Sequence, residues 1–193
     1  MKTKTINLYQ FEELTTEQQE KVLDKYRDWN DDLTCDLLNY NDIHVIRLKE
    51  KGFLNPNISY DLSCSQGDGA SFTCTQLDYN LLLKDYKGKH KQWFIQILQY
   101  YGEVTIERHT HRYYHELTCR AEYYDRLPFD YPRIQAELDT IVEYIEHLRE
   151  QACLELAKYL QADIDYLESN EAIADILIAN EYYFNEDTLE IEY

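Results

Sequence analysis

The feature that most constrains the fold is an uninterrupted helical pattern over residues 133–168. Apolar side chains recur there at three- and four-residue spacing, and no Gly or Pro interrupts the run. This stripe consists of Ile134, Leu138, Ile141, Ile145, Leu148, Ala152, Leu156, Tyr159 and Leu160. At about 1.5 Å per residue the helix is roughly 50 Å long. The chain is therefore expected to contain one helix that is longer than a small domain is wide.

Two helices are expected in the first fifty residues, after a strand at residues 3–9. Thr15 and Gln18 have the spacing of a capping box. The apolar residues that follow at helical spacing are Val22, Leu23, Tyr26 and Trp29. A second helix is expected over residues 33–51, with Gly52 at its C-terminal end. Together these two helices would form a helical hairpin.

Four core strands are expected in two β-hairpins. Residues 57–64 and 70–75 alternate with a period of two, and Gly67-Asp68-Gly69 lies in the turn between them. A second pair of alternating segments covers residues 104–108 and 113–123, around His109-Thr110-His111. The pattern therefore predicts an antiparallel sheet of about four strands.

The remaining segments complete an α+β fold class. A helix broken near Gly88 is expected over residues 79–101, between the two hairpins. A short helix from Ser169 to Ile178 and a small hairpin over residues 182–193 follow the long helix. With helices packed on one face of the sheet, the expectation is a single domain over residues 1–193.

Composition indicates a reduced, cytoplasmic protein. The N-terminus has no apolar segment typical of a signal peptide, and no run approaches the roughly 18–20 apolar residues of a membrane span. The five cysteines are odd in number and never spaced as CxxC, which predicts buried free thiols. A net charge of -18 argues against direct nucleic-acid binding over most of the chain. We therefore expect a cytoplasmic protein without a membrane or nucleic-acid partner.

The negative charge is concentrated in the C-terminal third. Residues 121–193 contain 19 acids and 4 bases, whereas residues 1–120 contain 18 acids and 15 bases. On the long helix Asp139, Glu143, Glu146 and Glu150 are expected to form one exposed line. Such a line could imitate nucleic-acid phosphates and dock on a basic protein, or it could simply keep the helix face soluble.

Two clusters are candidates for chemistry. His109, His111, Tyr113 and His115 alternate, but the turn between the strands breaks a metal-binding arrangement, so no metal and no cofactor are expected. The second cluster is a small-ligand site at the two hairpins, with the candidate residues Gln66, Asp68, Ser71, Tyr114, His115 and Glu116. It has neither a Walker loop nor a nucleophile with a base at fixed spacing, so no catalytic residue is expected.

Four blocks resemble a family of small proteins encoded by phages and prophages, some of them labelled antitoxin-like. These blocks are Leu8-Tyr9-Gln10-Phe11-Glu12-Glu13-Leu14 with Gln19-Glu20-Lys21-Val22, then Ser65-Gln66-Gly67-Asp68-Gly69-Ala70-Ser71-Phe72, Arg112-Tyr113-Tyr114-His115-Glu116, and Ala179-Asn180-Glu181-Tyr182-Tyr183-Phe184-Asn185-Glu186-Asp187. The resemblance extends from end to end of the chain and implies a phage context without implying catalytic residues. An aromatic residue usually precedes the second block in that family, whereas Leu62-Ser63-Cys64 stands there in this chain.

Three functional hypotheses follow. The first is a non-enzymatic, anti-CRISPR-like inhibitor of host defence, which covers a basic nucleic-acid-handling host protein with an acidic, nucleic-acid-mimicking surface. Its expected contact residues are Asp139, Glu143, Glu146, Glu150, Glu186, Asp187, Glu190 and Glu192. The second is a ligand-binding, metal-binding or enzyme-like site at the hairpins, and the third is an antitoxin. Pairing of the long helix with a second copy stays open as a route to a homodimer.

Overall fold

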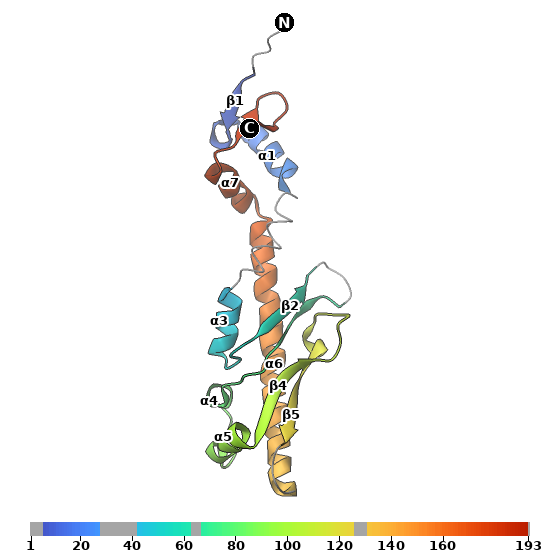
Figure 1. Ribbon diagram of the computed structural model, residues 1–193. Helices are drawn as coiled ribbons and strands as arrows, with labels where there is room; N and C mark the ends of the chain where they lie inside the picture. Colours follow the sequence, from blue (N-terminus) through green and yellow to red (C-terminus); the bar gives the residue numbers. More distant parts are fainter. Residues whose placement is uncertain (1–5, 28–41, 63–66, 126–130, 193) are drawn as a thin grey trace. The chain divides into compact units, whose positions relative to one another are not determined.

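The computed structural model describes residues 6–27, 42–62, 67–125 and 131–192 (Figure 1). The chain divides into two compact units: unit 1 comprises residues 1–40 and 160–193, and unit 2 comprises residues 41–159. The expected α+β class is confirmed, with antiparallel sheets and one long helix. A single domain over residues 1–193 stays a prediction. No helix in the described ranges is long and apolar enough to cross a membrane.

Unit 2 contains the two predicted β-hairpins. β2 (Asn57–Asp61) pairs antiparallel with β3 (Gly69–Thr73), and β4 (Gly102–Arg108) pairs antiparallel with β5 (Cys119–Asp125). Directly after β3, the backbone of Cys74 exchanges two hydrogen bonds of 3.0 and 2.7 Å with that of Ile106. The two predicted hairpins are thus two-stranded sheets that this isolated bridge joins, with the end of β3 beside β4.

The second hairpin differs from its prediction over residues 113–118. These residues form a loop and the 3-10 helix η3 (Glu116–Thr118) instead of extending the strand. Leu117 N–H donates to His115 Nδ1 at 3.2 Å, and Thr118 Oγ1 donates to the His115 carbonyl oxygen at 2.7 Å. Such local side-chain hydrogen bonds compete with a strand ladder. The strand predicted over residues 113–123 is therefore wrong in its first part, because β5 begins only at Cys119 and His115 lies in the loop before it.

The helices of unit 2 follow the predicted pattern. α4 (Tyr79–Leu82) and α5 (Lys91–Tyr100) confirm a helical segment that is broken before and after Gly88. α3 (Asp42–Glu50) is the last part of the helix predicted over residues 33–51. Residues 28–41, where the turn of the predicted helical hairpin falls, lie outside the described residues.

The long helix α6 (Pro132–Leu167) confirms the strongest sequence prediction. Its buried apolar stripe consists of Leu138, Ile141, Ile145, Ala152, Leu156 and Leu160. In unit 2, α6 lies behind the four strands in Figure 1, and Glu146 Oε2 accepts a hydrogen bond of 2.7 Å from Ala121 N–H of β5. Ile106 of β4 lies opposite Ala121, but its backbone N–H and C=O bond to Cys74 and not to β5. In an antiparallel pair of this kind both residues direct their backbone groups away from each other, so the Ala121 N–H lies on the outer edge of β5. α6 thus covers that edge.

Unit 1 is built from a small sheet and two helices. Its strands are β1 (Leu8–Gln10), β6 (Tyr183–Asn185) and β7 (Ile191–Glu192), in the order β1, β6, β7. α1 (Thr16–Lys25) begins with the predicted capping box, and α7 (Asn170–Ala179) begins at the N-cap Ser169. The buried core of this unit consists of Phe11, Leu14, Val22, Leu23, Ile173, Leu177 and Phe184.

Candidate functional site

The glycine turn of the first hairpin packs against the loop that precedes β5. Tyr114 N–H donates to the Gly67 carbonyl oxygen at 3.2 Å. A Cβ atom on Gly67 would lie 2.2 Å from a ring carbon of Tyr113, and one on Gly69 would lie 2.8 Å from the Cα of His115. Both glycines also have a positive φ, 107° and 146°. Close approach therefore requires glycine at both positions, and the two sequence blocks contact each other.

Ser71 lies fully buried at the centre of this contact. Its Oγ accepts a hydrogen bond from Arg108 Nη2 at 3.0 Å and shares a hydrogen bond of 3.1 Å with the Thr118 hydroxyl. The guanidinium of Arg108 lies 5.4 Å from the centroid of the Tyr114 ring. A serine nucleophile needs a base within hydrogen-bond reach, whereas Ser71 meets a hydroxyl and a guanidinium. We conclude that Ser71 joins the two loops and does not act as a nucleophile.

The candidate ligand residues have separate positions around Ser71. Tyr114 and His115 lie in the facing loop, and Asp68 lies in the turn between the two glycines. Glu116 contributes its backbone carbonyl, which accepts a hydrogen bond of 2.6 Å from Arg149. Gln66 lies outside the described residues. Within the described ranges, no group of three or more His, Cys, Asp or Glu side chains could hold a metal ion.

Arg149 is the buried polar centre that the sequence analysis missed. Its side chain is fully buried, with Nε 2.9 Å from Glu146 Oε2 and Nη2 2.8 Å from Glu146 Oε1. Burial opposes its charge, but the hydrogen bonds to Glu146 and the charges of Glu146 and Glu150 raise the pKa of Arg149. The available signal was its position, since Ile145, Arg149, Ala152 and Leu156 share one helical spacing. Arg149 fastens α6 to η3 and, through Glu146, to β5.

The cysteines described by the structure are free and buried, as predicted. They are Cys74, Cys119 and Cys153, whereas Cys35 and Cys64 lie outside the described residues. Burial raises the pKa of Cys153 to about 12. Because a thiolate is the reactive form of cysteine, this thiol is chemically inert in the folded protein at neutral pH.

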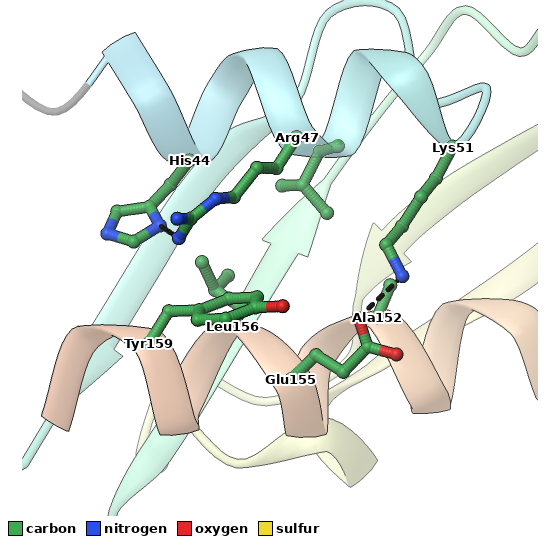
Figure 2. A pocket seen from close by; sticks show the side chains of 8 residues that line it. His44, Arg47, Lys51, Ala152, Glu155, Leu156 and Tyr159 are labelled. Atoms are coloured by element: carbon green, nitrogen blue, oxygen red, sulfur yellow. Dashed lines mark hydrogen bonds and ion pairs between the residues drawn. The ribbon is translucent and has the colours of Figure 1, made fainter. Parts of the chain in front are cut away.

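A narrow cleft between α3 and α6 shows how these helices pack in unit 2 (Figure 2). Lys51 Nζ lies 2.6 Å from Glu155 Oε2, and the guanidinium of Arg47 lies 4.1 Å from the centroid of the Tyr159 ring. His44, which is buried, stacks on the same ring. The volume of this cleft is about 10 Å³, which is room for about one water molecule. This contact therefore serves packing and leaves no space for a ligand.

The net charge separates along the boundary between the two units. Unit 1 contains 19 acids and 5 bases, a net charge of -14, whereas unit 2 contains 18 acids and 14 bases, a net charge of -4. Fourteen carboxylates of unit 1 are exposed in the described residues, and we call them the acidic surface of unit 1. They are Glu12, Glu13, Glu17, Glu20, Asp24, Asp165, Glu168, Glu171, Asp175, Glu181, Glu186, Asp187, Glu190 and Glu192.

The two groups of predicted contact residues differ in their exposure to solvent. Asp139 and Glu143 are exposed on α6 in unit 2, but Glu146 is half-buried and bonded to Arg149. Glu150 is also half-buried, with Oε1 3.7 Å from Arg149 Nη2. The four carboxylates thus do not form one exposed line. By contrast, all four acids of the second predicted patch are exposed members of the acidic surface of unit 1, namely Glu186, Asp187, Glu190 and Glu192.

Comparison with known proteins identifies a family without a described activity. No curated protein and no solved structure matches the chain. Residues 29–171 match a family described as a domain of unknown function, DUF8835. The match includes all of unit 2 and leaves β1, α1, β6 and β7 of unit 1 outside. Since it spans 143 of the 193 residues, the chain belongs to the DUF8835 family.

Proposed function

We propose that the protein binds a basic, nucleic-acid-handling host protein through the acidic surface of unit 1 and thereby excludes that protein's nucleic acid. In this proposal it is a phage-encoded, anti-CRISPR-like inhibitor of host defence. The observation that carries the proposal is the net charge of -14 on unit 1. Concentrated charge of one sign attracts an oppositely charged partner and speeds its association.

The cations of unit 1 leave most of this charge uncompensated. In the described part of the unit, Lys21, Lys25 and Arg27 face fifteen acids. Each cation lies within 3.3 Å of a carboxylate oxygen, and these carboxylates belong to Glu17, Glu190 and Asp24. Exposed pairs of this kind contribute only about 0–1 kcal/mol each. The surplus carboxylates therefore remain available to a basic partner, and an antitoxin would use the same surface on a different protein.

The hairpin assembly gives less support to an enzyme or ligand site. Ser71 and Arg149 are fully buried, and their hydrogen bonds hold loops and helix together. Their roles in stability account for the polar residues there without a substrate. The acidic surface has no comparable structural role, because most of its carboxylates lie on the outside of unit 1.

Matched charge variants test this proposal. The first neutralises Glu20, Glu168, Asp175 and Glu181 of unit 1, whose side chains make no hydrogen bond or ion pair with other described residues. The control neutralises Glu50, Glu137, Asp139 and Glu143, which are exposed acids of unit 2. Both sets use Glu→Gln and Asp→Asn and change the net charge equally.

Tagged wild type and both variants are used to capture proteins from bacterial lysate at about 0.05 M NaCl, followed by elution with about 0.5 M NaCl or with duplex DNA. We expect a basic nucleic-acid-binding protein that both treatments release. The unit 1 variant should retain at least about tenfold less of it than the control variant. Equal retention by the two variants, or a captured protein that DNA does not displace, would overturn the proposal.

A further inference from the structure

A second, larger cavity in unit 2 lies between α4, the residues after α3, and α6. Its volume is about 150 Å³. Phe53 and Leu82, only 1% and 3% exposed, supply apolar contact surface, and Leu81, Tyr144 and Leu148 add more of the lining. A cavity of about this volume with apolar walls accommodates one aromatic ring. Its size thus favours a small molecule over a segment of another protein.

The rim of this cavity is positively charged, in contrast to its unit. Lys51 and Lys84 line it together with Asp85 and Gln151. Lys51 pairs with Glu155 at 2.6 Å. Next to the rim, Lys91 Nζ donates to the carbonyl oxygens of Leu83 and Lys84, both at 3.0 Å. Two lysines and one acid therefore line the cavity, with Lys91 and Glu155 next to it, within a unit of net charge -4.

We propose that this cavity binds a small aromatic carboxylate. The ring lies against Phe53 and Leu82, where its transfer from water is favourable. The carboxylate faces Lys84, because the ammonium of Lys51 already has Glu155 as its partner. An apolar body held by the walls and oriented by one charged group is the usual composition of a small-molecule site. All lining residues fall within the segment that matches the DUF8835 family.

The probe for this site is 4-fluorophenylacetate, observed by fluorine NMR during titration with the full-length protein. We expect saturable line broadening that Leu81→Trp and Leu148→Trp each reduce at least about tenfold, because the larger side chain fills the cavity. Leu81 is 39% exposed, so a tryptophan at this position tests the site without overpacking the buried core. Leu54→Trp, in a different and open groove of unit 2, is the control and should bind like wild type.

The charge preference is tested with Lys84→Gln and with the neutral probe 4-fluorobenzyl alcohol. Lys84→Gln should weaken the acid by about two- to fivefold, as expected for an exposed ion pair, and leave the alcohol unchanged. The control Lys49→Gln, an exposed lysine of α3 outside the lining, should change neither. Absence of saturable binding, or equal binding to wild type and both filled variants, would overturn the site. Equal binding of the acid and the alcohol would overturn the proposed preference for a carboxylate.

Discussion

Replacing Arg149 with Met tests whether the buried guanidinium holds unit 2 together. The substitution removes both hydrogen bonds to Glu146 and the one of 2.6 Å to the Glu116 carbonyl oxygen. It leaves a half-buried carboxylate beside β5 without its cation. Removing one partner of a buried pair typically costs about 3–5 kcal/mol. We therefore expect Arg149→Met to lower the free energy of unfolding by about 4 kcal/mol. This is a large fraction of the total, because whole domains are stable by only about 5–15 kcal/mol.

The double variant Glu146→Gln with Arg149→Met separates lost charge pairing from lost packing. The introduced amide side chain would carry no charge yet retain a carbonyl acceptor for the Ala121 N–H. We therefore expect the double variant to be more stable than Arg149→Met alone by at least about 1 kcal/mol. Arg133→Met, an exposed position of the same helix, is the control and should change stability by less than about 0.5 kcal/mol.

Urea unfolding provides the measurement. Circular dichroism follows the helices, and Trp93 fluorescence reports on unit 2 in a Trp29→Phe background, because the chain has only these two tryptophans. A cost below about 1 kcal/mol for Arg149→Met would refute the reasoning, as would a double variant less stable than the single one. Either result would mean that Arg149 is tolerated in the interior and does not organise it.

Further predictions concern the glycine turn, the buried thiol and the acidic surface. Gly69→Ala should destabilise more than Gly67→Ala in thermal unfolding, because the added Cβ meets the backbone of His115 in the first case and a movable Tyr113 ring in the second. Cys153 should react with a thiol reagent only on unfolding. Because burial raises the pKa of the Cys153 thiol in the folded protein, the neutral thiol stabilises the fold fully below about pH 9, and this stabilisation is lost as the pH rises towards 12. Cys153→Ala should therefore reduce the loss of stability between pH 9 and pH 12. Added NaCl should raise the melting temperature, and less so in the unit 1 charge variant, because salt screens the repulsion between carboxylates.

Periodicity predicted most of the helices and strands because they have one buried face. α6 lies within one residue of its predicted limits, since its stripe continues without a Gly or Pro to end it. The first hairpin and its glycine turn were likewise predictable from alternation and from the need for positive φ. The contact of that turn with the 113–115 loop was only a hypothesis, because alternation does not determine which loops approach each other.

The sequence predictions failed where side chains form local hydrogen bonds, and where the interacting residues are far apart in the sequence. Residues 113–118 alternate like a strand, yet His115 and Thr118 satisfy the backbone within the loop and end the ladder. The pairing of β1 with β6 joins opposite ends of the chain, for which sequence alternation gives no register. The burial of Arg149 was not predicted, because charged residues are rarely fully buried, and the bidentate contact with Glu146 is what permits it.

The charge division has an energetic consequence that connects stability with binding. Unit 1 buries a core of seven side chains in its described residues while its net charge is -14. Mutual repulsion of the carboxylates lowers the stability of this unit, whereas unit 2 has nearly balanced charge. A basic partner would remove that repulsion on binding, so part of its affinity would appear as stabilisation of unit 1. Amide hydrogen exchange should therefore be faster in α1 and α7 than in β4 and β5, and should slow in α1 and α7 when a captured partner is added. Protection confined to unit 2 would place the binding surface there instead and contradict the acidic surface as the point of contact.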